Sequence, residues 1–578
     1  MRRLTRPRGA RVAVVVTVLA LGPAAVAAAL RLPLINQLDW ADAWFYSGYG
    51  WVPKHHFHVY GWTYFGVRFP AILPIGVFAR VFGTYGGYVL LRYILAVASG
   101  VAVYLGVRRF AGTGVAVSTA FLLYLNPFFS RMLLWDYAGF AAVSAGVIGV
   151  ALWWWSDERG LAWTLLPGAA LASALFANAL FGTALVVLAA VELVAATRTS
   201  LAACVRLAGR IVVAVLGGLI VFALGYVGYV AILGSFSPLD LVRPTIDFVR
   251  SNEQNSAMYQ HPPSEWLAHE VRIWMPVVLS VAVAASLGRR LFGSDLRARV
   301  AQTAIGYTVL LWIYRATVTS SVVETWWAYA LVVVALAPAM GVLLQEVATM
   351  RTGRRAWAAA AGVAIVVALA IRTFDGNADR LYSWIERHPD AVYALLGAGL
   401  ACALLLLIRA EALRAASLCA VFALTTLMAW APSVFDGRGT TGVFVRDWAA
   451  DWHAYAAARS FVDLDRRYDS AQSHVYTWFP GTLGITNIAW AALPQIGTTV
   501  QLLNSGEPLD KLLPLGRARL RLPNAAYVLI MSPQPSDIPD AEHALAQNGF
   551  GTREVKTGLW DDGRLRYALL SLTSKPPS

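Results

Sequence analysis

Long apolar runs recur along most of this chain, and they constrain its fold more than any other feature. The first covers residues 12–30, which is long enough to cross the hydrocarbon core of a bilayer as a helix. The chain is 58% hydrophobic and only 14% charged, whereas soluble domains carry about 25% charged residues. The sequence therefore predicts a polytopic α-helical membrane protein.

The apolar runs predict about thirteen transmembrane helices. In this arrangement the arginine-rich connections, such as "RRF" and "GRRLFGSDLRAR", all fall on one side of the membrane. Because arginine and lysine are enriched in cytoplasmic loops, we expect that side and the N-terminus to face the cytoplasm. The predicted spans are 12–30, 88–107, 113–130, 136–155, 161–177, 179–197, 211–233, 273–288, 300–315, 326–345, 356–372, 391–408 and 415–431.

One apolar run, "FPAILPIGVFARVFG" at 69–83, does not fit a crossing helix. Its Pro70, Pro74 and Arg80 favour a helix that lies along the outer interface. If this run crossed the bilayer, Arg108 and Arg109 would face outward, against the pattern of the other connections.

The chain divides by composition into two predicted domains. Residues 1–435 form the transmembrane domain, whose first outer loop, 31–87, carries juxtamembrane helices. After that point the apolar runs shorten, and residues 436–578 are predicted to form a small extracytoplasmic α/β domain. Within it the patterns indicate helices at 443–467 and 540–550, a buried strand at 525–531, and two strands, "TREVKTGLW" and "RLRYALLSL", joined at "DDG".

The formal net charge of +14 does not indicate a nucleic-acid partner. The arginines lie mostly in short clusters between apolar runs, which is the pattern of cytoplasmic membrane loops. The lipid bilayer is therefore the predicted partner of the basic residues.

Three carboxylates fall at the outer ends of predicted spans, where an aqueous site would open. Asp39 and Asp42 lie in "LDWADAWFYSGYGW", three residues apart, so they would share a face of a helix. Asp136 precedes the fourth span and returns to the same surface. Two converging carboxylates can orient and deprotonate a hydroxyl group. The alternatives are a helix N-cap or a salt-bridge partner.

Four stretches together resemble one family of membrane enzymes. "DAWFY", Asp42 to Tyr46, resembles the D-E-x-x-Y signature of polyprenyl-phosphate-dependent glycosyltransferases of the GT-C superfamily, which include protein mannosyltransferases and the aminoarabinose transferases of lipid A. "RFPAILPIGVFARVFG", "LLRYILAVASGVAVYLGVRRF" and "LNPFFSRMLLWD" are similar to segments that follow it in that family. The chain departs from the signature at Ala43, where the family usually has a second acid.

The resemblance implies a GT-C fold and a defined chemistry in a bacterial plasma membrane. The donor would be a polyprenyl-phosphate sugar, and the acceptor an envelope glycan, lipid or protein on the outer face. Asp42 would act as the base, with inversion at the anomeric carbon, and Asp136 would be the second acid. Asp39 either replaces the acid missing at Ala43 or caps the helix that presents Asp42.

Cationic side chains are needed for the departing phosphate, because fixed donors stabilise developing negative charge. The candidates are Lys54, Arg131, Arg315 and Arg372, with contacts to lipid headgroups as the alternative for the arginines. Tyr46 and His58 in the first outer loop, and Tyr259 and His261 in the long loop at 234–272, are candidate acceptor or loop contacts. His55 and His56 have the spacing to bind a divalent metal ion, with plain interfacial histidines as the alternative.

Two other functional classes compete with the transferase. A transporter or flippase of lipid-linked sugars should carry charges or helix breaks at mid-membrane in paired halves, but here the charges cluster at span ends. A non-catalytic envelope scaffold, binding partners through its outer domain, is the other alternative.

Overall fold

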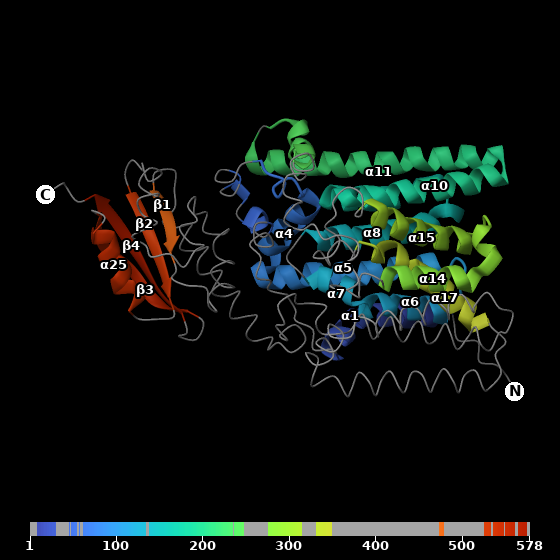
Figure 1. The fold of residues 1–578 in the computed structure, drawn as a ribbon, viewed down its shortest axis with the longest axis horizontal. Coiled ribbons are helices and arrows are strands. Elements are labelled where there is room, and N and C mark those ends of the chain that lie inside the picture. The colour runs from blue at the N-terminus through green and yellow to red at the C-terminus, as the bar shows by residue number, and fades with distance from the viewer. Residues whose placement is uncertain are drawn as a thin grey trace.

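The structure is a computed structural model of the whole chain, and the residues that it describes form a helical body and a small sheet (Figure 1). The described residues are 8–29, 46, 48–51, 53–54, 57, 62–134, 138–234, 236–247, 275–314, 331–349, 473–478, 525–532, 536–547, 550–560 and 565–574. The last three predicted spans and the predicted helix at 443–467 lie outside them.

Apolar helices follow the predicted spans closely. Within the described residues, four are long and apolar enough to cross a membrane: Gly86–Val107, Gly139–Glu158, Ala179–Thr199 and Leu201–Leu233. The helices are α1 (Arg8–Ala29), α4 (Phe69–Phe82), α5 (Thr84–Val107), α6 (Thr113–Leu125), α7 (Pro127–Leu134), α8 (Gly139–Trp155), α9 (Leu165–Ala177), α10 (Gly182–Thr199), α11 (Leu201–Leu233), α14 (Met275–Leu287), α15 (Leu296–Tyr314) and α17 (Val333–Thr349).

Two predicted span boundaries are wrong. The run at 113–130 is not one helix, because Pro127 has no N–H to continue the ladder. Helix α6 ends at Leu125, and the Asn126 side chain accepts a hydrogen bond from Phe129 N at 3.1 Å to begin α7. Helix α11 begins ten residues earlier than predicted, at Leu201, where the Ser200 side chain accepts a hydrogen bond from Ala203 N.

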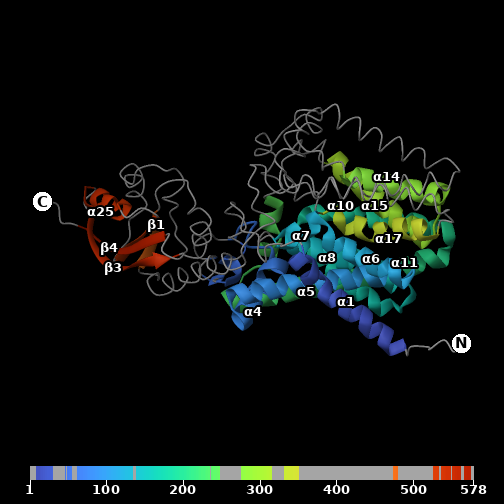
Figure 2. The same ribbon diagram turned by 90° about the horizontal axis from the view of Figure 1, so that it is seen from below.

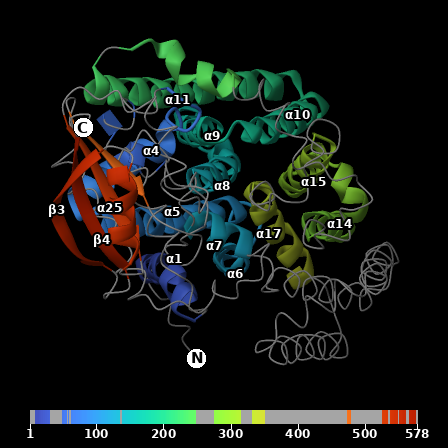
Figure 3. The same cartoon turned by 60° about the vertical axis from the view of Figure 1, so that its left-hand side comes forward.

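Helix α8 lies at the centre of the helical body. Most of its residues are buried, and it packs against α5, α9 and α17. Figure 3 shows α17 beside α6, Figure 2 shows α14 and α17 close together, and Figure 1 shows α10 running beside α11. Helix α8 is shielded from lipid by these neighbouring helices, so its small residues allow the helices to pack closely.

The connections between helices gather at two ends. One end, which we call the basic end, holds the turns at 107–113, 155–165, 197–201 and 288–299, which are joined by ion pairs and by hydrogen bonds from arginine side chains to backbone carbonyls. The other, the aromatic end, holds 62–69, 83–88 and 226–242. Helix α4 contacts Gly87 near the start of α5, and Gly225 and Gly228 near the end of α11. The position of 69–83 along the outer interface stays a prediction.

Helix α1 is fastened to the body at its proline. Pro23 has no N–H to donate to the carbonyl of Leu19, four residues earlier. The Tyr124 hydroxyl donates to that carbonyl instead, at 3.1 Å. Gly100 of α5 makes room for this, because a Cβ there would lie 1.8 Å from the Tyr124 hydroxyl. An unpaired carbonyl in a bilayer is costly, so this contact stabilises the α1 docking.

We therefore expect Gly100→Ala to lower the free energy of unfolding by about 1–3 kcal/mol, because Tyr124 must move and release Leu19. Unfolding in detergent with increasing dodecyl sulfate would measure this. Gly114→Ala in α6 is the matched control, since no atom lies within 4 Å of its added methyl group. Equal stability of the two variants would contradict this account.

The sheet has the strand order β1-β2-β4-β3, with β1 (Ser473–Trp478) parallel to β2 (Ala525–Ser532). Strand β4 (Leu565–Ser574) is antiparallel to β2 and to β3 (Phe550–Trp560). Helix α25 (Asp537–Gln547) packs on β2 and β3. The predicted strands and helix at 525–574 are confirmed, with α25 beginning three residues early. Strand β1 was not predicted.

Candidate functional site

The aromatic end is where the sequence analysis placed a site, and three of its predicted residues belong to the described part of the chain. Tyr46 is buried, Lys54 is exposed, and Arg131 lies on α7. The other candidates fall outside the described residues, and their roles stay predictions: Asp39, Asp42, His55, His56, His58, Asp136, Tyr259, His261, Arg315 and Arg372.

Tyr46 ends the "DAWFY" motif, and its ring faces a buried arginine. The guanidinium carbon of Arg68 lies 5.3 Å from the Tyr46 ring centroid and 3.9 Å from that of Tyr64. The exposed fraction of Arg68 is 1%. Cation–π contacts of a desolvated guanidinium contribute about 2 kcal/mol. Arg68 therefore holds the last residue of the motif against the start of α4.

A second buried arginine lies on α5. The guanidinium carbon of Arg92 is 3.5 Å from the ring centroid of Tyr88 and 4.1 Å from that of Phe140, and its exposed fraction is 2%. The Trp51 ring packs edge-on against Tyr88, with the centroids 5.9 Å apart. The first loop is thus joined to α5 and α8 around a buried positive charge.

Arg68 and Arg92 were not among the predicted site residues, although both lie in the stretches that carry the family resemblance. An arginine inside an apolar, aromatic-rich run was the available signal, because intramembrane cations are costly and are kept for a purpose. Sequence reasoning passed over them in favour of arginines at predicted span ends.

Hydrogen bonds and stacked rings hold the first loop against the end of α11. The Tyr229 hydroxyl donates to Gly66 O at 2.6 Å. The Trp62 and Phe236 rings stack with centroids 4.6 Å apart, and Phe57 lies 4.6 Å from Trp62. Since Phe236 opens the long loop at 234–272, the two predicted outer loops meet at this stack.

Tyr49 adds a hydrogen bond within the same loop. Its hydroxyl lies 3.1 Å from Thr63 Oγ1. Burial raises the pKa of Tyr49 to about 12, and the bond with Thr63 opposes that rise. The hydroxyl joins Tyr49 to Thr63 within the first loop.

Tyr229→Phe should loosen this loop, because it leaves the Gly66 carbonyl without its donor at a cost of about 1–3 kcal/mol. Trypsin cleavage after the exposed Lys54 reports the opening, and we expect it to be at least about fivefold faster. Tyr226→Phe is the control, because its hydroxyl makes only a long, 3.4 Å contact with Phe236 O. Similar cleavage rates in both variants would contradict a clamping role for Tyr229.

Metal binding finds no support among the described residues, where no three histidine, cysteine, aspartate or glutamate side chains come together. His55 and His56, the candidate ligands, lie outside that part of the chain. A divalent metal ion stays a prediction.

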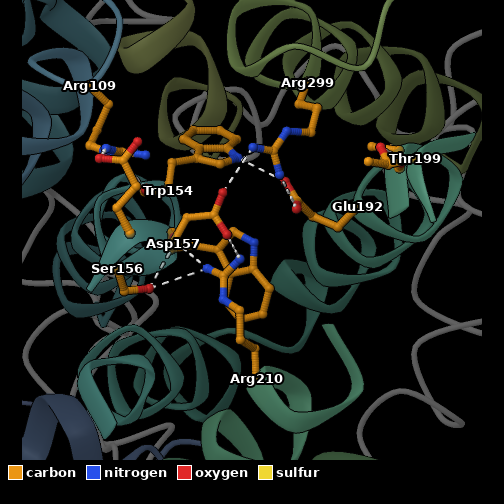
Figure 4. Close-up of polar contacts among 11 residues, drawn as sticks. Arg109, Trp154, Ser156, Asp157, Glu192, Thr199, Arg210 and Arg299 are labelled. Carbon is orange, nitrogen blue, oxygen red and sulfur yellow. Dashed lines mark hydrogen bonds and ion pairs between the residues drawn. The ribbon is translucent and has the colours of Figure 1, made fainter. Parts of the chain in front are cut away.

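The basic end holds a network of ion pairs that joins five segments (Figure 4). Arg299 of α15 lies 2.6 Å from a carboxylate oxygen of Glu192 and 3.0 Å from one of Asp157. Arg210 lies 2.7 Å from Asp157, and the indole N–H of Trp154 donates to Glu192 at 3.1 Å. Glu192 is only 3% exposed, so its charge depends on these partners.

Three further ion pairs extend the network. Arg109 pairs with Glu158 next to Asp157. Burial lowers the pKa of Arg109; Asp157 opposes the change, and Arg299 and Arg159 add to it. On α17, Glu346 pairs with Arg290 and, at 2.9 Å, with Arg297.

The network explains why the arginine clusters of the sequence share one side. The described connections near 108–110, 155–159, 198–210 and 290–299, which were assigned to one face of the membrane, meet here through side-chain contacts. The acidic partners Asp157, Glu192 and Glu346 were missed, because only the carboxylates of the opposite face were considered. A glutamate inside "VVLAAVELVAATR" was the available signal.

Comparison with known proteins gives a likeness at the level of solved structures. The chain is similar to ArnT from Cupriavidus metallidurans in the apo state, with 16% identity, a TM-score of 0.48 and 99% of each chain covered. The same protein bound to undecaprenyl phosphate gives 14% identity and a TM-score of 0.47, covering 99% of this chain and 100% of that one. No family model and no curated protein matches.

Proposed function

We propose that this chain is an integral-membrane glycosyltransferase that moves a sugar from a polyprenyl-phosphate donor to an envelope glycan, lipid or protein. The reaction would take place at the aromatic end, facing away from the cytoplasm in a bacterial plasma membrane. This proposal joins the motif resemblance of the sequence to the architecture of that end.

The observation that carries the proposal is the packing of Tyr46 against Arg68. Tyr46 is the last residue of the "DAWFY" motif, and it is buried at the end of helices long enough to span a membrane. A lipid-phosphate donor cannot move its phosphate out of the headgroup layer, so a transferase for it needs its reacting groups at such a place.

The proposed chemistry is an inverting displacement. Asp42 takes the proton of the acceptor hydroxyl as the hydroxyl oxygen bonds to the anomeric carbon of the sugar. The bond from that carbon to the phosphate oxygen breaks, and the polyprenyl phosphate leaves with the electron pair. Asp136 is the second acid, and Asp39 replaces the acid absent at Ala43 or positions Asp42.

Cations would stabilise the phosphate as it gains charge. Lys54 is exposed eight residues after Tyr46 and is the first candidate. Arg131, Arg315 and Arg372 are the further ones, and the buried Arg68 and Arg92 contribute positive potential to the same end. Tyr259 and His261, in the loop that begins near Phe236, are candidates for acceptor contacts.

Incubation of the purified protein in liposomes with a panel of polyprenyl-phosphate sugars and envelope extracts tests the proposal. We expect sugar transfer, or slow hydrolysis, together with release of polyprenyl phosphate detected by mass spectrometry. Turnover of no donor would refute the transferase. Movement of an intact lipid-linked sugar across the bilayer would then favour a flippase, and its absence a scaffold.

The orientation has a test of its own. A reporter fused after Arg109 is expected to give a cytoplasmic signal, because this position lies at the basic end. A signal from outside would reverse the proposed topology and move the reaction to the other face.

A further inference from the structure

Two groups of arginines lie around the turn between α8 and α9 at the basic end. Arg109, Arg210 and Arg299 are paired with carboxylates in the network. Arg159, in the turn itself, and Arg206, on α11, are exposed. Neither of these two makes an ion pair with any residue in the described ranges.

Arg159 and Arg206 belong to one corner of the body. A Cβ on Gly209 of α11 would lie 3.6 Å from the Leu161 side chain, so this part of α11 runs beside the turn. Arg206 lies one helical turn before Gly209 and Arg210, on the same face of α11. Arg210 in turn reaches back to Asp157 at the start of the turn.

Positive charge is in surplus at this corner. The acidic groups nearby are Asp157, Glu158 and Glu192, and all three are already engaged with the paired arginines. Five arginines thus face three carboxylates, and the excess sits on the two exposed side chains. A partner that complements this corner carries negative charge.

The same turn exposes apolar and aromatic side chains. The Arg159 guanidinium lies 4.6 Å from the Trp155 ring centroid, and Trp163 packs edge-on against Trp155 at 5.4 Å. Trp163 is 47% exposed, and Leu161 and Leu166 are each 48% exposed. Tryptophan and arginine at the end of a spanning helix are typical of the headgroup layer.

We propose that this corner, formed by Arg159, Arg206 and Trp163, binds the headgroup of an anionic phospholipid. The two guanidinium groups contact the lipid phosphate, and Leu161 and Leu166 lie against its acyl chains. The site is separate from the transferase site at the aromatic end, and it requires no catalytic activity.

Native mass spectrometry of the delipidated full chain, titrated with phosphatidylglycerol or phosphatidylcholine, tests the site. We expect tighter binding of phosphatidylglycerol than of phosphatidylcholine. Arg159→Gln and Arg206→Gln should each weaken phosphatidylglycerol binding about fivefold, and the double variant about 25-fold, because each basic residue near an anionic surface contributes about one such factor.

Arg553→Gln with Arg566→Gln is the charge-matched control, since both arginines are exposed on the sheet. It should bind phosphatidylglycerol as the parent does. An equal affinity of the double corner variant and the parent would overturn the site, and so would equal binding of the two lipids. Displacement of phosphatidylglycerol by excess inorganic phosphate would show a phosphate-ion site in place of a lipid site. If the double variant does not fold, the single variants decide.

Discussion

Asp42→Asn is expected to lower the rate of sugar transfer by about 10²–10⁴-fold, because an amide cannot accept the proton of the acceptor hydroxyl. The change keeps the shape of the side chain, so a loss of rate with unchanged donor binding identifies a base. Single-turnover transfer from the polyprenyl-phosphate sugar that is active in the panel measures this. The pH dependence should change with it, since the rate of the parent falls as the carboxylate is protonated.

Asp136→Asn should also reduce the rate, while Asp540→Asn on the exposed face of α25 serves as the control and should not. Asp39→Asn separates the two roles proposed for that residue. A loss comparable to that of Asp42→Asn assigns Asp39 to the chemistry, and a small loss with lower stability assigns it to capping. Full activity of both Asp42→Asn and Asp136→Asn, in protein that still folds, would refute the enzyme.

Arg299→Met is expected to have the largest effect on stability, a loss of about 3–5 kcal/mol in the free energy of unfolding, because it leaves the buried Glu192 carboxylate without its cationic partner. Arg299 is the one side chain that contacts both Asp157 and Glu192 in the described network. Unfolding by dodecyl sulfate in mixed micelles measures the loss.

Arg289→Met is the matched control, because it removes an exposed arginine from the same end; its effect should stay within about 0.5 kcal/mol. Adding Glu192→Leu to Arg299→Met should restore part of the stability, since it removes the uncompensated charge. A double variant that is less stable than Arg299→Met would show that Glu192 is held by something other than charge pairing.

The helices were predictable because a bilayer imposes a simple rule: apolar stretches of about 20 residues must be helical. Helices α5, α9 and α10 therefore follow the predicted spans within a few residues. Individual residues shifted other helix ends from the predicted positions. Pro127, for example, separates α6 from α7 within one predicted span. Strand β1 was missed because its ladder with β2 joins Ser473 to Ala525, far along the chain, and no periodicity within "SHVYTW" reports such a partner.

The site was less predictable than the fold, because its contacts are non-local. The sequence placed Tyr46 near the candidate acids, but it did not show that the Tyr46 ring packs on Arg68 or that Arg92 packs on Tyr88 and Phe140. At the basic end, too, the sequence does not show which arginine pairs with which carboxylate. Arg299 and Asp157 are separated by 142 residues, and only the threading of the helices brings them together. The positions of Asp42 and Asp136 relative to these arginines stay predictions.

The same pairing has a consequence for biosynthesis. Glu192 is made with α10, but its partner Arg299 follows 107 residues later. At a synthesis rate of about 5–20 residues per second, the carboxylate waits roughly 5–20 s for that arginine. During this interval the Glu192 carboxylate has the indole N–H of Trp154 as its described hydrogen-bond partner. Nascent chains halted before α15 should therefore be the ones that membrane quality-control proteases remove fastest.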